Sequence, residues 1–248
     1  MVKLGIIGGS GLDDPQLLEG VQTVAVETPY GEPSSVITQG RIGGVDAAIL
    51  ARHGRGHTIS PTKVNYRANI YALKAVGVTH IIATTACGSL REEIGRGHFV
   101  TPDQFIDFTK YRANTFFDSF EKGAKHTAMA DPYDAGLRRA LVETARELGY
   151  DIHDKGTLIT IEGPRFSTRA ESHMFRILGG DIVNMSGTPE VILANEIGIP
   201  YAAIAMSTDY DCWKTDEEPV TWDDILAVFH KNADNVKRIL INVAAKIA

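Results

Sequence analysis

Residues 199–211 read Ile-Pro-Tyr-Ala-Ala-Ile-Ala-Met-Ser-Thr-Asp-Tyr-Asp, an apolar run that ends in two carboxylates. The run has the length and composition of a strand buried on both faces, as in a parallel sheet covered by helices. Ligands of such sheets bind outside the carboxyl ends of the strands, where Asp209 and Asp211 are expected. Tyr210 and Trp213 add aromatic surface there, and a carboxyl group partly removed from water has a raised pKa that suits proton transfer. Taken alone, two acids at a strand end are more often a solvated corner. The interpretation therefore depends on the rest of the chain.

Length and charge restrict the class of protein. The chain has 248 residues, of which 44% are hydrophobic, and this suffices for one sizeable core. Lys and Arg number 25 against 31 Asp and Glu, and the net charge of −6 argues against a nucleic-acid-binding protein. No segment has the ~18 uninterrupted apolar residues of a membrane-spanning helix, and the N-terminus does not resemble a signal peptide. We therefore expect a cytoplasmic protein. The two cysteines, Cys87 and Cys212, predict neither a disulfide framework nor a metal site.

Apolar periodicity predicts strands that alternate with helices. Strands are expected at residues 3–7, 21–26, 35–38, 45–50, 79–83, 100–108 (interrupted at Pro102), 158–161, 182–184 and 199–204. Helices are expected at 62–76, 134–149, 167–177, from Thr188 and Pro189 to 197, and from Thr221 to the end. Residues 114–130 show no period and predict a long loop of the kind that carries function or an interface. The pattern indicates a single α/β domain over residues 1–248, with a mixed sheet flanked by helices.

Four further strand ends carry residues that can bind an anion. Residues 8–11, Gly-Gly-Ser-Gly, allow close approach of backbone N–H groups, but they match neither the Walker nor the dinucleotide pattern. Arg52 and His53 follow another strand, where Arg52 offers a planar fork of donors and His53 adds a donor whose charge is tunable near neutral pH. Residues 84–86 and 185–186 follow two more. Each motif could be a tight turn or a solvated loop, but convergence of five polar strand ends predicts one ligand site.

Several segments resemble the methylthioadenosine phosphorylases, a group within the trimeric purine nucleoside phosphorylase family. The likeness extends from about residue 3 to the last helix, and it is carried by residues 5–12, 51–55, 63–66, 84–93, 160–166 (Thr-Ile-Glu-Gly-Pro-Arg-Phe) and 208–214. It implies a nucleoside phosphorylase-like, partly barrel-like sheet and a reaction in which phosphate displaces adenine from methylthioadenosine. Phosphate would be a co-substrate, with no metal or organic cofactor. The assembly would be a homotrimer or a dimer of trimers.

The resemblance also implies a role for individual positions. Phosphate would be bound by Ser10, Arg52, His53, Thr85, Ala86 (through its backbone N–H) and Ser186. The nucleoside would be bound by Phe166, Ser167, Met185, Asp209 and Asp211, with His126 reaching the 5' end of a neighbouring subunit's substrate. Asp209 would be the catalytic acid that protonates N7 of the leaving purine.

Two positions bear on the substrate. Relatives that use 6-oxopurines carry Glu and Asn where this chain has Ser167 and Asp209, and a carboxylate facing O6 would be mispaired. This favours 6-aminopurine nucleosides. The animal relatives extend past the position of Ala248 and carry a small aliphatic residue at the position of Trp222. We therefore expect a 5' pocket that is more open, or closed differently, with Trp222 in it.

Two alternatives stay open at this point. The first is a phosphorylase for 6-oxopurine nucleosides or methylthioinosine. The second, from a different class, is a non-catalytic nucleoside or nucleotide sensor on the same fold. Phosphate-dependent release of adenine separates both from the main interpretation.

Overall fold

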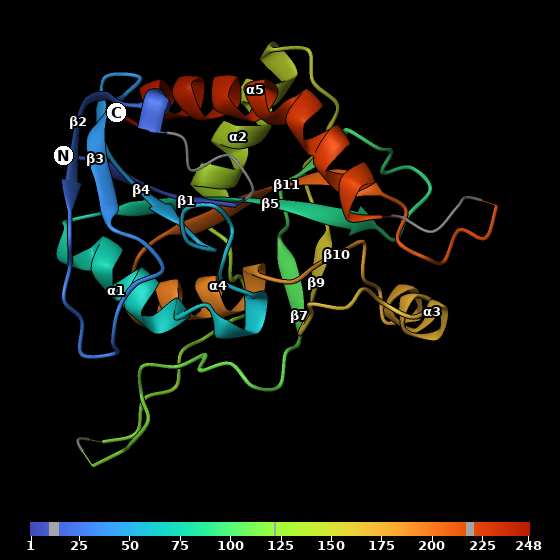
Figure 1. The fold of residues 1–248 in the computed structure, drawn as a ribbon, viewed down its shortest axis with the longest axis horizontal. Coiled ribbons are helices and arrows are strands. Elements are labelled where there is room, and N and C mark those ends of the chain that lie inside the picture. The colour runs from blue at the N-terminus through green and yellow to red at the C-terminus, as the bar shows by residue number, and fades with distance from the viewer. Residues whose placement is uncertain (10–14, 122, 217–220) are drawn as a thin grey trace.

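In this computed structural model of the protein, residues 1–9, 15–121, 123–216 and 221–248 are described, apart from the side chains of Pro15 and Trp222. The described residues form one mixed sheet with five α-helices around it (Figure 1). The strands are β1 (Lys3–Gly8), β2 (Glu19–Val24), β3 (Ile37–Ile42), β4 (Val45–Ala51), β5 (His80–Ser89), β6 (Phe99–Val100), β7 (Gln104–Phe108), β8 (Ile152–His153), β9 (Thr157–Ile161), β10 (Ile182–Asn184) and β11 (Tyr201–Asp209). The helices are α1 (Tyr66–Ala75), α2 (Ala135–Glu147), α3 (Arg169–Ile177), α4 (Gly187–Glu196) and α5 (Trp222–Lys246), with short 3-10 turns η1 (Pro15–Leu17) and η2 (Pro61–Lys63).

The strand order places the carboxyl ends of four long strands together. The main path runs β2-β3-β4-β1-β5-β10-β9-β7, while β11 pairs with both β5 and β6. Strands β1, β4, β5 and β11 are mutually parallel where they pair. The branch at β5 gives the sheet a partly barrel-like form that does not close among the described strands. The predicted mixed sheet flanked by helices is confirmed, and the predicted site edge exists.

Alternation along the central strands distributes the core over both faces of the sheet. On β11, Ala202, Ile204 and Met206 point into one apolar cluster, and Tyr201 and Ala203 point into another. The first cluster is covered by α2 and α5 and the second by α1 and α4, on opposite sides of the sheet in Figure 1. Because both faces are covered, the strand has the continuous apolar sequence from which it was predicted.

Strands β3, β5 and β11 continue past their predicted ends. The sequence predicted that the strand at 79–83 ends before Thr84, but β5 continues to Ser89. It can continue because β11 pairs with it as far as Gly88, and β10 pairs with Gly88 and Ser89 from the other side. On that other side the pairing of β5 with β1 ends at Ala83, so residues 84–87 of β5 have no described strand partner there. This gap in the sheet is where the cavity lies.

The start of α4 also differs from the prediction. The helix begins at Gly187 with Ser186 at the N-cap, so Thr188 is not the cap. The side chain of Ser186 makes no capping hydrogen bond. Instead Asn184 Oδ1 accepts from the backbone N–H groups of Ser186 and Gly187, at 3.3 and 3.4 Å. The predicted caps at Asp134 and Thr221 are confirmed, the second as a capping box with Asp224.

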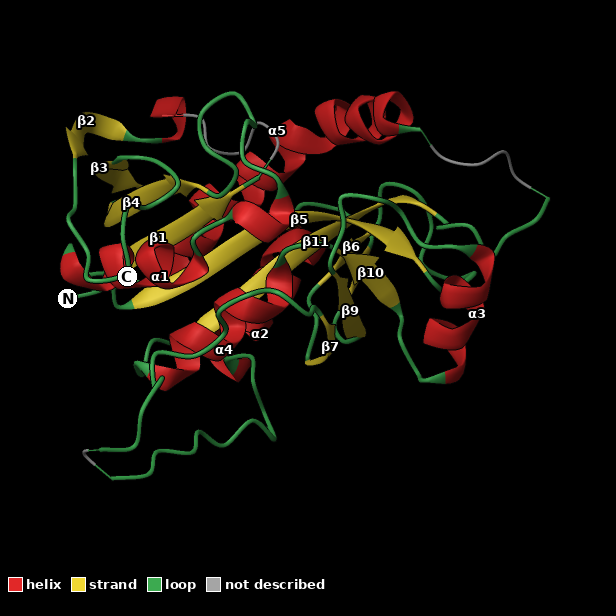
Figure 2. Cartoon of the chain, turned by 60° about the horizontal axis from the view of Figure 1, so that its bottom comes forward, coloured by secondary structure: helices red, strands yellow, loops and turns green. Residues whose placement is uncertain are grey.

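The predicted long loop is confirmed. The described residues between β7 and α2 contain no helix or strand, and residues 114–130, which we call the arm, project away from the body (Figures 1 and 2). The base of the arm is fixed by Glu196 of α4, whose two carboxylate oxygens accept from Thr115 Oγ and the N–H of Phe116, both at 2.6 Å.

Candidate active site

One cavity opens at the carboxyl ends of β1, β4, β5, β10 and β11. Its empty volume is about 830 Å³, within the range of small-molecule sites. Its lining includes ten residues predicted from the sequence: Arg52, His53, Thr85, Ala86, Phe166, Ser167, Met185, Ser186, Asp209 and Asp211. The five separated strand ends therefore do form one site.

Three predicted residues are not placed in this cavity. Ser10 lies outside the described residues, and Trp222 begins α5 with a side chain that is not described. His126 lies on the arm, where its ring packs edge-on against Phe120 with 5.4 Å between centroids. Within one chain, His126 therefore does not contribute to the site.

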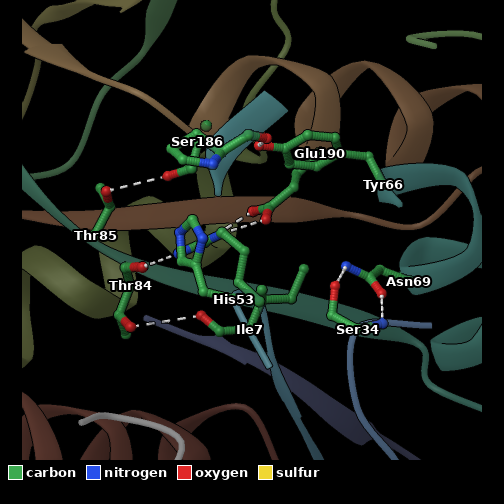
Figure 3. A network of polar contacts seen from close by, with 12 residues as sticks. Ile7, Ser34, His53, Tyr66, Asn69, Thr84, Thr85, Ser186 and Glu190 are labelled. Carbon is green, nitrogen blue, oxygen red and sulfur yellow. Dashed lines mark hydrogen bonds and ion pairs between the residues drawn. The ribbon is translucent and has the colours of Figure 1, made fainter. Parts of the chain in front are cut away.

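Arg52 lies at the anion end of the cavity and is held by a partner the sequence did not reveal. Its Nε and Nη2 donate to the two carboxylate oxygens of Glu190, at 2.5 and 3.0 Å, and its Nη1 donates to the carbonyl of Thr84 (Figure 3). Glu190 also accepts from the hydroxyl of Tyr201. These contacts use three of the five N–H groups of the guanidinium, which leaves two for an anion. Gly9 leaves room for the guanidinium, because a Cβ there would make a tight contact with Arg52 Nη1 at 3.0 Å.

His53 is fixed as a neutral ring. Its Nδ1 lies 2.9 Å from the carbonyl oxygen of Ile59, which can only accept, so Nδ1 carries the proton. Burial, followed by the charge of Arg52, lowers the pKa of His53 to about 3. Its Nε2 is therefore an acceptor near neutral pH, and it suits a protonated oxygen of an anion. The sequence had predicted a donor here.

Hydroxyl groups complete the anion end. Thr85 Oγ and Ser186 Oγ lie 3.4 Å apart and come from β5 and from the start of α4 (Figure 3). The N-terminus of a helix favours negative charge, because its first N–H groups and its dipole point toward it. A small oxyanion would thus meet hydroxyls, a guanidinium and a helix end.

Met185 lies between the two ends and is held through its backbone. Its carbonyl accepts from Arg112 Nη1 at 2.6 Å, while Arg112 Nη2 donates to the carbonyls of Ile161 and Glu162. Arg112 thereby ties the ends of β9 and β10 together. The sequence did not indicate Arg112, because it stands between the strand predicted at 100–108 and the loop predicted at 114–130, outside every predicted strand end. Gly163 has φ +64°, and a Cβ there would lie 2.5 Å from Met185 Sδ.

The acidic end contains two buried carboxyl groups with different surroundings. Asp209 is 5% exposed and accepts from the hydroxyl of Thr208 and the N–H of Asp211. Burial raises the pKa of Asp209 to about 6, and burial also raises the pKa of Asp211. Asp211 Oδ2 and Ser167 Oγ are buried and make no hydrogen bond of good geometry with the described residues. This end can therefore both protonate and hydrogen-bond a heterocycle.

The cavity thus places an anion-binding cradle next to a pocket with a protonatable acid, at the carboxyl edge of a mixed α/β sheet, which is the arrangement that displacement of a heterocyclic base by an anion requires. The chain belongs to the Phosphorylase superfamily, whose family model matches residues 3–245. It is similar to the S-methyl-5'-thioadenosine phosphorylases of Xenopus tropicalis (56% identity over 100% of this chain and 89% of that protein) and Drosophila melanogaster (53%, 100% and 86%).

Solved structures agree with these relatives. Methylthioadenosine phosphorylase from Schistosoma mansoni in complex with adenine has a TM-score of 0.94 and 45% identity, over 100% of this chain and 92% of that chain. A variant of adenosine/methylthioadenosine phosphorylase from the same organism, in complex with methylthioadenosine, has a TM-score of 0.93 and 44% identity, with the same coverage.

Proposed function

We propose that the protein catalyses the phosphorolysis of S-methyl-5'-thioadenosine to adenine and S-methyl-5-thioribose 1-phosphate. The observation that carries this proposal is the presence in one cavity of Arg52 at an anion end and Asp209, with a pKa of about 6, at an acidic end. The names of the relatives and the ligands in the titles of the similar structures support it.

The geometry suits a displacement at C1' of the ribose. Phosphate is held by Arg52, Thr85 and Ser186, and the neutral ring of His53 accepts a hydrogen bond from the P–O–H of hydrogen phosphate, which keeps its proton. Phosphate then stabilises the cationic character that develops on the sugar and attacks C1'. Asp209 delivers a proton to N7 of the purine, which leaves as neutral adenine. The proton that the leaving purine needs comes from Asp209, and the attacking phosphate keeps its own, so we propose that no metal or organic cofactor takes part.

The acidic end favours a 6-aminopurine. The carboxylate oxygens of Asp209 and Asp211 and the Ser167 Oγ can accept from an exocyclic amino group. A 6-oxopurine would bring O6 against these acceptors and would leave its N1–H without the carboxylate that relatives provide after the equivalent of Phe166. Activity on 6-oxopurine nucleosides is therefore the weaker alternative.

We propose a homotrimer or a dimer of trimers in which the arm donates His126 to a neighbouring cavity. Support comes from the projecting arm, from the exposed Phe120 on it (51%) and from Tyr111 at its base (79%). We further propose that residues 1–248 act as one domain and that the enzyme works in the cytoplasm. Among the described helices, none has the length and apolar character needed to cross a membrane.

Phosphate-dependent adenine release tests the function directly. A panel of methylthioadenosine, adenosine, methylthioinosine, inosine and guanosine at fixed phosphate should show turnover of the first two and little of the others. A protein that binds methylthioadenosine but releases no adenine with phosphate would be a sensor, and the proposal would be wrong.

A further inference from the structure

We propose that Asn184 is a positioning residue that fixes the hydroxyl of Thr85 as a hydrogen-bond donor to phosphate. This inference rests on the proposed function, because it assigns a role in binding the phosphate co-substrate. Asn184 ends β10, is 5% exposed and lines the anion end of the cavity. Nothing in the sequence pattern indicates it, since an amide at a strand end is usually part of a turn.

The orientation of the Asn184 amide is determined by its neighbours. Its Oδ1 faces the backbone N–H groups of Ser186 and Gly187, which can only donate, and it also accepts from Thr160 Oγ at 2.9 Å. The amide nitrogen must therefore lie on the other side, where Nδ2 donates to Thr85 Oγ at 3.2 Å. Gly187 leaves room for this arrangement, because a Cβ there would lie 3.2 Å from Asn184 Nδ2.

These contacts form a series of hydrogen bonds in which every group donates toward Thr85. The N–H of Thr188 donates to Thr160 Oγ, Thr160 donates to Asn184, and Asn184 donates to Thr85. Each hydroxyl group in this series accepts a hydrogen bond from the preceding donor and has one proton to donate to the next acceptor. The proton of Thr85 can go to the carbonyl of Ala86, 2.9 Å away, to Ser186 Oγ, 3.4 Å away, or to an anion oxygen in the cavity, but not back to Asn184.

The substitution Asn184→Asp reverses the direction of the hydrogen bond to Thr85 while keeping the shape of the side chain. Its Oδ1 still accepts from the start of α4, and a negative charge next to a helix N-terminus is favourable. The second oxygen cannot donate to Thr85, so the Thr85 hydroxyl turns toward the carboxylate and away from phosphate. We expect the KM for phosphate to rise by roughly 10- to 100-fold, the effect of losing a hydrogen bond to a charged group. The KM for methylthioadenosine should change less than about twofold.

Two controls separate this role from a structural one. Thr160→Val removes an upstream contact but leaves the two backbone donors that orient Asn184, so it should lower thermal stability without moving the KM for phosphate. A double-mutant cycle of Asn184→Ala with Thr85→Val isolates the contact itself. Asn184→Ala should raise the KM for phosphate several-fold in the wild-type background and have almost no effect in the Thr85→Val background.

The outcomes decide between the explanations. If the unchanged enzyme releases no adenine with phosphate, the proposed function fails before any variant is made. If it is active and Asn184→Asp leaves the KM for phosphate unchanged, the inference is wrong. An equal effect of Asn184→Ala in both backgrounds would likewise overturn it, because Asn184 would then only support α4. The cycle decides even if Asn184→Asp fails to fold.

Discussion

The guanidinium of Arg52 and the carboxylate of Glu190 face each other through two hydrogen bonds in the interior, and each side chain is only 1% exposed. The two residues come from the end of β4 and the first turn of α4, 138 positions apart in the sequence. Removing both charges from water costs free energy that their attraction offsets only while both are present. If Arg52 binds phosphate as proposed, the pair links phosphate binding to stability.

Arg52→Ala should damage both properties. It removes a charge-assisted donor to phosphate, so the KM for phosphate should rise and turnover should fall. The lost contact corresponds to roughly 1.5–3 kcal/mol of binding free energy. It also leaves Glu190 buried without its partner, and we expect the free energy of unfolding to fall by about 3–5 kcal/mol. Phosphate kinetics and denaturant unfolding on the same preparation measure the two effects.

The double variant Arg52→Met with Glu190→Gln is the matched control. It removes both charges, and stability should recover most of the loss, because no uncompensated charge is buried. The KM for phosphate should stay high. Recovery of phosphate binding in the double variant would show that Arg52 supports the fold and does not bind the anion.

The raised pKa of Asp209 predicts how stability depends on pH. The folded-state pKa of about 6 lies above the ordinary value of 3.8, so the folded protein binds more protons than the unfolded chain between these values. The protonated carboxyl contributes stability that is fully present below about pH 4 and is lost as the pH rises through 6. Asp209→Asn should remove this dependence and make the protein more stable than wild type at pH 7–8. Melting curves of both proteins from pH 5 to 8 test it, and parallel curves would contradict the assignment.

The same pKa predicts the activity profile. If Asp209 donates the proton to the purine, kcat/KM for methylthioadenosine should decline as the pH rises above about 6. His53 should not add an inflection between pH 5 and 8, because its pKa is lowered to about 3 and its ring stays neutral there. A profile that rises through this range would contradict the role of Asp209 as the acid.

The close approach of Gly163 to Met185 predicts that a single added methyl group disturbs the nucleoside pocket. Gly163→Ala introduces a Cβ that would lie 2.5 Å from Met185 Sδ, at a residue with φ +64°. The backbone alone should cost about 1–2 kcal/mol of stability, and the displaced Met185 should raise the KM for the nucleoside. Gly149→Ala is the control, since it has φ +77° and nothing within 4 Å of a new Cβ. It should lower stability similarly and leave the KM unchanged; an equal KM for both variants would mean that Met185 does not contact the substrate.

The projecting arm leads to the prediction that His126 of one subunit contributes to the cavity of its neighbour. His126→Ala should preserve the assembly and raise the KM for methylthioadenosine, because the histidine is remote from its own cavity. His173→Ala, on the exposed surface of α3, is the matched substitution and should leave the kinetics unchanged. Light scattering that shows an active monomer would disprove the assembly, whereas an active trimer indifferent to His126→Ala would disprove only the donation.

The sequence predicted the residues of the site better than their connections. Strand ends could be found because β1, β4 and β11 are continuous apolar runs that stop at polar residues, and this pattern is local. The partners of those residues are not local: Asn184 reaches Thr85 across 99 positions, and Arg112 reaches Met185 across 73. No periodicity records such pairs. The extension of β5 past Ala83 was missed for the same reason, since it depends on β10 and β11 as neighbours.

Asp209 and Ser167 carry the last prediction, which concerns the purine. Asp209→Asn keeps the shape of the side chain: its oxygen can accept from the N–H of Asp211, and its amide can donate to Thr208 Oγ, which then donates to the carbonyl of Cys87. The amide cannot supply a proton, so turnover of methylthioadenosine should fall on the order of 10²–10⁴-fold. Activity on methylthioinosine should fall less or rise, because an amide can donate to O6. Adding Ser167→Glu should shift the preference further, since a carboxylate there can accept from N1–H of a 6-oxopurine. The ratio of kcat/KM for the two nucleosides, measured on both variants with their melting temperatures, tests this. An unchanged ratio in folded protein would mean that Asp209 does not contact the purine.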